Sequence, residues 1–403
     1  MKTLSPFTRA YYRAFQEAFH IAMPLLPYRK PFIVDELIDI PTVLEFEGCH
    51  HPIIVTDPGV AKLGLAKPLF DALEVTNTPY SVYDRTVPNP TTETVEEALK
   101  VYLQDSCDSI IGFGGGSSMD CAKALAVRAA KPNKTLVQQK GILRVHKKLP
   151  LLIAVPTTAG TGSETTLAAV IVDADTRLKY AINDFPLIPR YAVLDPAVTA
   201  TLPPSLTSST GMDALTHAVE AYIGRSTTKD TREDALTATK LIFESLDDAY
   251  EHGDNMDARR NMLNASFLAG CAFTKSYVGY IHAIAHSLGG KYNVPHGYAN
   301  AVILPLMLER YGEAAEPALA ELAVAAGVAG EDADRHDAAV AFIDAVKDMK
   351  KRFGIGDTFP ELKREDIPEL ARIAAAEANP LYPVPVLMSA QELETIYEDL
   401  LEE

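Results

Sequence analysis

The sequence predicts an α/β domain with a parallel sheet over residues 1–200, followed by an all-helical domain over residues 201–403. Two observations lead to this fold class. Between about residues 50 and 195, short β-branched runs alternate with helical patterns, as in parallel α/β proteins. After residues 202–210 the strand signal disappears, and helical patterns continue to the C-terminus. A chain of 403 residues is long enough for two such cores.

The expected strands are short, apolar and rich in β-branched residues. They cover residues 52–57, 109–116, 151–158, 169–173 and 191–195, with a weaker candidate at 81–84. Helical periodicity covers residues 93–106 and 117–130. Because the strands are apolar almost throughout, we expect a sheet that is covered on both faces.

A helical extension is predicted over about residues 1–30. Phe7, Tyr11, Phe15 and Phe19 recur at intervals of four, which places them on one face of a helix. Large aromatic side chains favour a docking face over a transit peptide.

Composition narrows the class of protein. The formal charge is −17 and there is no long basic run, so nucleic acid and anionic membranes are disfavoured as partners. No apolar stretch is long enough for a spanning helix or resembles a signal peptide, which predicts a cytoplasmic protein. The four cysteines form no CxxC pair, which favours reduced, structural thiols.

Two polar loops follow neighbouring predicted strands. The first, GGGSSMD at residues 114–120, opens a helix, whose N-terminal N–H groups suit a phosphate; a tight strand-to-helix turn explains it as well. The second, PTTAGTGSE at residues 156–164, places three threonine hydroxyls at the same edge of the sheet. Two such loops side by side are what a dinucleotide requires.

Asp57 ends the first predicted strand, which covers residues 52–57. There it could accept hydrogen bonds from an adenosine ribose and repel a 2′-phosphate, which would select NAD over NADP. An aspartate that stabilises a turn or caps a helix is an equally open interpretation, since VTDPG has good turn chemistry.

The helical half contains a cluster of potential metal ligands. Asp213 and His217 are four residues apart on one predicted helix, His282 and His286 repeat that spacing, and His296 follows. Imidazoles with one carboxylate suit Fe(II) or Zn(II) better than Mg(II) or Ca(II). The spacing decides neither between these two metals nor between His282 and His286 as ligands. Such an ion could act as a Lewis acid on an alcohol oxygen.

These segments, together with LDP near residue 195, LPPSLTSSTGMDALTHAVEAY and HAIAHSLGGKYNVPHGYANAVILP, resemble the iron-containing (group III) alcohol dehydrogenase family over most of residues 50–312. The resemblance implies a Rossmann-like nucleotide-binding domain and a helical metal-binding domain, the dehydroquinate synthase-like fold. It implies Asp213, His217, His282 and His296 as metal ligands, and leaves His286 as a possible proton-relay group. It also implies cofactor contacts from Asp57, Gly114, Gly115, Gly116, Ser117, Thr157, Thr158, Thr161 and Lys179.

The expected function is therefore a metal-dependent, NAD(H)-linked alcohol dehydrogenase or aldehyde reductase for a small primary alcohol or diol, with Fe2+ or Zn2+ and a homo-oligomeric, dimeric state. One alternative is a dehydroquinate-synthase-like lyase that also binds NAD and a metal. Its substrate would need several basic residues, and few candidates exist beyond Lys275. A non-catalytic, assembly-forming relative is the other alternative, against which the intact ligand positions argue. Residues 378–388 depart from the family, because many members carry an NPR-type segment there.

Overall fold

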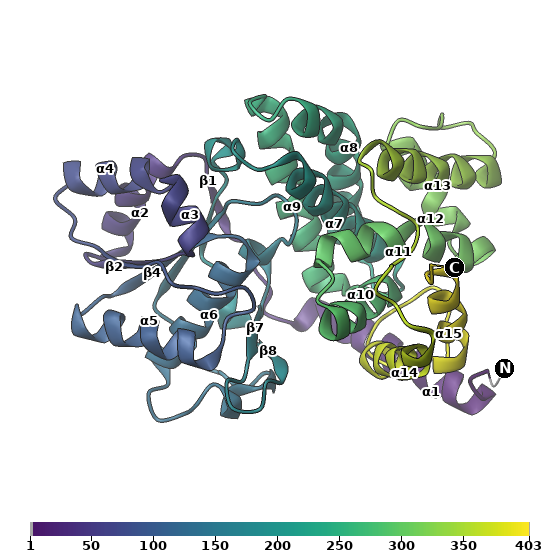
Figure 1. Ribbon diagram of the computed structural model, residues 1–403, viewed down its shortest axis with the longest axis horizontal. Helices are drawn as coiled ribbons and strands as arrows, with labels where there is room; N and C mark the ends of the chain where they lie inside the picture. Colours follow the sequence, from purple (N-terminus) through teal and green to yellow (C-terminus); the bar gives the residue numbers. More distant parts are fainter. Residues whose placement is uncertain (1–2, 403) are drawn as a thin grey trace. The chain divides into compact units, whose positions relative to one another are not determined.

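The computed structural model describes residues 3–402, and the chain forms two compact units (Figure 1). One unit is Pro27–Thr201, which contains the strands of the parallel sheet. The other is helical and combines the residues before Pro27 with those from Leu202 onward. No helix among the described residues is long and apolar enough to cross a membrane.

The α/β unit is built on a six-stranded, wholly parallel sheet with the order β1-β9-β6-β4-β2-β3. Its strands are β1 (Phe32–Val34), β2 (Pro52–Val55), β3 (Ser81–Tyr83), β4 (Ser109–Gly114), β6 (Leu151–Pro156) and β9 (Tyr191–Val193). The central strands β4 and β6 pair in register from Ser109 with Leu151 to Gly114 with Pro156. The two polar loops therefore leave the sheet side by side.

Helices cover both faces of this sheet, as Figure 1 shows. On one face, α5 (Thr92–Gln104) and α6 (Gly116–Ala130) pack against Ile53 and Ile110. On the other face, α2 (Ile40–Glu47), α3 (Pro58–Leu63) and α4 (Lys67–Val75) meet Ile54, Ile111 and Ile153. Successive strand residues thus enter opposite cores, which explains why these strands are apolar throughout.

The stretch 169–173 was expected in the parallel sheet, and that expectation is wrong. It forms β7 (Ala168–Val172) in a separate three-stranded sheet, which also contains β5 (Gly141–Ile142) and β8 (Lys179–Asn183). β7 pairs antiparallel with β8, and only alternate residues such as Ala169 and Ile171 are buried. A strand with one buried face suits this small sheet, whereas a central parallel strand is buried on both faces.

The helical unit consists of ten α-helices together with short 3-10 turns over the residues that the structure describes. These helices are α1 (Pro6–Ala22), α7 (Pro204–Ile223), α8 (Lys229–Glu251), α9 (Met256–Ser276), α10 (Tyr280–Tyr292), α11 (His296–Tyr311), α12 (Glu316–Ala325), α13 (Arg335–Arg352), α14 (Ile367–Ala378) and α15 (Ala390–Asp399).

The N-terminal helix α1 differs from the expectation in two respects. It groups with the helical unit and not with the α/β half. Only part of its aromatic stripe packs on the chain, because Phe7 is 84% and Tyr11 56% exposed, whereas the Phe19 ring meets that of Tyr277 edge-on at 5.2 Å. Arg13 also donates hydrogen bonds to the carbonyl oxygens of Val384 and Pro385, and Gln16 donates to that of Tyr382. Backbone carbonyls need donors, which these polar side chains supply and aromatic rings cannot.

Candidate functional site

The glycine-rich loop ends β4 and opens α6 with an uncovered helix N-terminus. Gly114 has a φ of +149°, and a Cβ at this position would lie 2.6 Å from the Ser118 hydroxyl oxygen. Gly115 is the N-cap residue of α6 and makes no side-chain capping bond. The first N–H groups of the helix are therefore available to an anionic group.

The threonine loop lies against this helix start. The Thr157 N–H donates to the carbonyl oxygen of Gly114 at 3.1 Å. Cβ atoms built on Gly115 and Gly116 would lie 3.7 Å from Thr158 and 3.4 Å from Thr161. The Thr158 hydroxyl is buried and lacks a hydrogen-bond partner among the described residues. The structure thus brings the predicted glycines and threonines together around a polar group that a ligand could satisfy.

Asp57 lies beside the same loop and also caps a helix. Its Oδ1 accepts hydrogen bonds from the N–H groups of Gly59 and Val60, which fixes the start of α3. Its Oδ2 accepts a hydrogen bond from Ser118 at 3.2 Å. Both interpretations of Asp57 are geometrically compatible, since each carboxylate oxygen can accept more than one bond.

Lys179 is linked to the glycine-rich loop through a residue that the sequence did not single out. Its Nζ donates to Oδ1 of Asn89 at 2.8 Å, and the Asn89 N–H donates to the Ser117 hydroxyl at 3.3 Å. Burial is the main cause that lowers the pKa of Lys179. Asn89 has a φ of +54°, a conformation that asparagine tolerates in turns. The residues around Asn89 show no pattern that predicts this contact.

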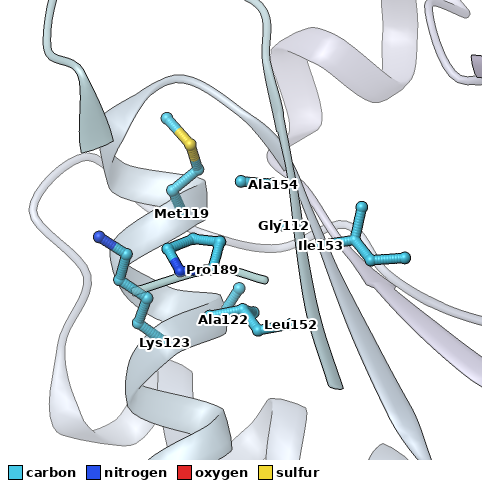
Figure 2. A pocket seen from close by; sticks show the side chains of 8 residues that line it. All are labelled: Gly112, Met119, Ala122, Lys123, Leu152, Ile153, Ala154 and Pro189. Atoms are coloured by element: carbon cyan, nitrogen blue, oxygen red, sulfur yellow. The ribbon is translucent and has the colours of Figure 1, made fainter. Parts of the chain in front are cut away.

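Helix α6 lies very close to the sheet behind this cradle. Figure 2 shows the narrow space between them, lined by Gly112, Met119, Ala122, Lys123, Leu152, Ile153, Ala154 and Pro189. A Cβ on Gly112 would lie 3.0 Å from the Cβ of Ala122, so a larger residue there would push α6 away from the sheet. The space is a packing contact that fixes α6, and it has no room for a ligand.

The candidate metal ligands converge within the helical unit. Asp213 and His217 come from α7, His282 from α10 and His296 from α11. One ligand atom from each lies within 4.8 Å of all the others. Three of these side chains are nearly fully buried, whereas the His296 side chain is 39% exposed. The donor set is three imidazoles and one carboxylate, which suits a divalent transition metal.

Close helix packing produces this convergence. A Cβ on Gly297 would lie 2.4 Å from the carbonyl oxygen of Ser209, so a glycine is needed for α11 to begin against α7. The His217 ring stacks on Phe273, with centroids 4.2 Å apart and planes inclined by 15°. These contacts fix α7 against both α11 and α9.

Glu220 supports His282 from behind. Its Oε2 lies 2.6 Å from Nδ1 of His282, and its Oε1 accepts the Ile281 N–H. A Cβ on Gly279 would lie 2.6 Å from that Oε1, so glycine makes room for the carboxylate. Burial raises the pKa of Glu220 to about 7 and lowers that of His282 well below its usual value. A neutral imidazole with Nδ1–H toward Glu220 presents the Nε2 lone pair to the cluster.

Asn300 connects three of the four candidate ligands. Its Nδ2 lies 2.7 Å from Oδ1 of Asp213, and 3.2 and 3.3 Å from Nε2 of His282 and His296. One oxygen and two imidazole nitrogens from three different ligands therefore lie around one point, as the donor atoms of a metal site do.

His286 lies beside this cluster and has its own support. Its ring stacks on that of His296 at 5.2 Å, and its Nδ1 lies 2.6 Å from Oε1 of Glu377. The Tyr382 hydroxyl donates to the same oxygen at 2.8 Å. Burial acts to raise the pKa of Glu377, but His286 and Tyr382 outweigh it, so the pKa is lowered and the carboxylate stays ionised.

Sequence reasoning missed these supporting residues, although a signal existed for two of them. Glu220 lies seven residues after Asp213, and Asn300 four after His296, so each shares a helix face with a ligand. Glu377 and Tyr382 carry no such signal, because they lie far from His286 in the sequence.

Two family models match the chain. Residues 31–196 match the iron-containing alcohol dehydrogenase model, and residues 207–401 match the C-terminal model of the Fe-containing alcohol dehydrogenase family. Among curated proteins, 1,3-propanediol dehydrogenase of Klebsiella pneumoniae is 37% identical over 337 residues, which are 82% of this chain and 87% of that protein. Alcohol dehydrogenase 4 of Schizosaccharomyces pombe is 42% identical over 261 residues, which are 65% of this chain and 62% of that protein.

Solved structures agree with the sequence comparisons. The chain resembles 1,3-propanediol oxidoreductase with a TM-score of 0.88 and 33% identity, covering 93% of this chain and 98% of that one. It resembles sulfoacetaldehyde reductase from Bifidobacterium kashiwanohense, solved in complex with NAD+, with a TM-score of 0.82, 30% identity and the same coverage. These matches confirm the predicted fold class.

Proposed function

Because the chain belongs to the iron-containing alcohol dehydrogenase family, we propose that it is a metal-dependent enzyme that transfers a hydride between a small primary alcohol or diol and NAD. It works in either direction, as an alcohol dehydrogenase or an aldehyde reductase. The small-alcohol preference is supported by the propanediol-named relatives.

The observation that carries this proposal is the convergence of Asp213, His217, His282 and His296. In the proposal these four residues hold one Fe2+, with Zn2+ as the other ion that the same donors accept. The ion, when bound, supplies Lewis acidity toward an alcohol or aldehyde oxygen. Glu220 and Asn300 hold the ligands in place, since they hydrogen-bond to His282 and Asp213.

The dinucleotide binds in the α/β unit. The N-terminus of α6 holds the pyrophosphate through Gly114, Gly115, Gly116 and Ser117, and Thr157, Thr158 and Thr161 supply hydroxyl and backbone contacts. Asp57 binds the adenosine ribose and disfavours a 2′-phosphate, and Lys179 adds a cation beside Ser117 through Asn89.

His286 exchanges the proton that accompanies oxidation or reduction. Its side chain is 44% exposed, so it can pass a proton to solvent. Glu377 stabilises the protonated imidazole and fixes the ring orientation, and Tyr382 holds Glu377.

The proposal also includes a cytoplasmic location and a homodimer. None of the four cysteines forms a disulfide, as expected in a reducing compartment. The edge strand β1 exposes Phe32 and Ile33 by 62% and 51%, and such an edge suits pairing with a second copy. Light scattering of the purified protein measures the oligomeric state.

A His282→Ala variant tests the proposed function. It removes a buried ligand, so metal content and turnover should be lost together. Normal turnover in metal-free His282→Ala protein would contradict the proposal. A Lys240→Ala change on the exposed face of α8 serves as the control and should alter neither.

A further inference from the structure

Lys123 is a fully buried lysine whose ammonium group is enclosed by oxygen atoms. It lies in the second turn of α6, facing the sheet (Figure 2). The residue is 0% exposed. Its Nζ lies 2.6 Å from the Ser163 carbonyl oxygen, 3.0 Å from that of Thr166 and 2.9 Å from that of Ala168. The hydroxyl oxygens of Ser163 and Thr166 lie at 3.2 and 2.8 Å. Five acceptors thus surround three N–H donors.

Burying the ammonium group of Lys123 costs folding free energy, so we expect this side chain to do more than fill space in the core. Burial lowers the pKa of Lys123 to about 8, although Asp120 and Glu164 act in the opposite direction. Glu164 is 1% exposed, and its carboxylate oxygens have no hydrogen-bond partner among the described residues. A well-packed apolar side chain would generally stabilise a helix–sheet contact at least as well as this charge.

The bonds of Lys123 join the two loops that form the dinucleotide cradle. The threonine loop is attached to the glycine-rich loop at its start, where the Thr157 N–H donates to Gly114. Lys123 attaches the other end of the loop, at Ser163 and Thr166, to α6. Gly162 lies between these two attachments with a φ of +59°, a conformation that glycine adopts readily.

We propose that Lys123 is a positioning residue for the dinucleotide: it holds Thr158 and Thr161 beside the N-terminus of α6 and thereby forms the cradle before the cofactor arrives. This inference rests on the proposed function, because it assumes that the cofactor occupies these loops. A preformed site avoids the entropy cost of ordering the loop on binding, so loss of the lysine weakens cofactor binding more than it slows turnover.

Lys123→Met keeps the length of the side chain and removes the ammonium group. The dissociation constant of NADH, measured directly by fluorescence titration, should rise by roughly tenfold or more, whereas kcat at saturating NADH changes by less than about threefold. Val127→Ala is the matched control, since Val127 is also fully buried on α6 but lies one turn farther from the loop. It should lower the melting temperature without changing NADH affinity.

If Lys123→Met does not fold, Ser163→Ala and Thr166→Val each remove one hydroxyl acceptor and should weaken NADH binding by a smaller factor. An unchanged NADH dissociation constant in folded Lys123→Met, or in both single-acceptor variants, would overturn the inference. Wild-type protein that binds no NADH would overturn the proposed function itself, so the two failures are distinguishable.

Discussion

The carboxylate of Glu220 lies 2.6 Å from Nδ1 of His282, and the two side chains are only 1% and 3% exposed. A buried imidazole held in this way has one tautomer and one orientation, because its Nδ1–H is committed to the carboxylate. Its Nε2 is then the atom that lies beside Asn300 and the other candidate ligands. His286 has a similar carboxylate partner in Glu377, but its side chain is 44% exposed and it lies outside the group of four potential ligands.

Glu220→Ala should weaken metal binding by roughly 10- to 100-fold, the usual effect of removing a hydrogen-bond partner of a ligand. Competition between the protein and a chromophoric chelator for Zn2+ or Co2+ measures this directly. Glu244→Ala, an exposed carboxylate on α8, is the control. Equal affinity in Glu220→Ala and wild type would show that His282 needs no such support.

Asn300→Ala should also weaken metal binding, because Asp213 loses the N–H donor that fixes its Oδ1. The expected loss is again about tenfold or more. The test is the same chelator competition, with circular dichroism to verify the helical content. An affinity that rises after the substitution would mean that the Asn300 amide blocks the cluster and does not order it.

Glu377→Gln should lower kcat while leaving metal content unchanged, because it removes the charge that stabilises protonated His286. A decrease of about tenfold or more is expected, since positioned acid–base groups contribute roughly 100- to 10,000-fold. Tyr382→Phe keeps the charge and removes one hydrogen bond, so its effect should be smaller. Steady-state kinetics together with metal analysis decides the point, and full activity in Glu377→Gln would exclude the relay.

Asp57→Asn separates the two roles of Asp57. Asparagine caps a helix as well as aspartate does, so the melting temperature should stay unchanged, whereas loss of the negative charge should improve the use of NADPH. Asp57→Ala should also improve it, and should cost about 1 kcal/mol of stability because the cap is lost. The ratio of kcat/KM for NADH and NADPH is the measurement. An unchanged ratio in both variants would leave Asp57 as a helix cap only.

Glu164→Gln should change how stability depends on pH. Burial raises the pKa of Glu164 to about 7, so this carboxyl group takes up a proton on folding. Its contribution to stability is fully present below the unfolded pKa of about 4.5 and is lost as the pH rises through about 7. Relative to wild type, Glu164→Gln should therefore gain stability between about pH 5 and pH 8, on the order of 2 kcal/mol, since one pKa unit corresponds to about 1.4 kcal/mol. Urea unfolding at both pH values tests this, and parallel pH profiles would contradict it.

Local patterns in the sequence predicted five of the six strands of the parallel sheet, but not the edge strand β1. The apolar runs at β2, β4 and β6 and the loops after them are determined by neighbours in the chain, and the structure places Gly115 beside Thr158 as predicted. The prediction that β7 belongs to the parallel sheet was wrong. Its pairing with β8 depends on burial of one face only, which a run of five apolar residues does not reveal.

Contacts between segments that lie far apart in the chain could not be predicted from local sequence patterns. The docking of α1 depends on Arg13 meeting the carbonyl oxygens of Val384 and Pro385, more than 370 residues away. Likewise, Glu377 reaches His286 only because α14 packs against α10. Such pairs have no periodicity, so only the three-dimensional fold identifies them.

The most direct test of the proposed function is aldehyde-dependent loss of NADH absorbance by metal-stripped protein that is reconstituted with Fe(II) or Zn(II). We expect no turnover without metal, recovery with a reconstituting ion, and no recovery in Asp213→Ala or His282→Ala protein. Equal turnover with and without metal would contradict it. Metal and NADH binding without turnover of any small aldehyde would favour the lyase or the non-catalytic relative.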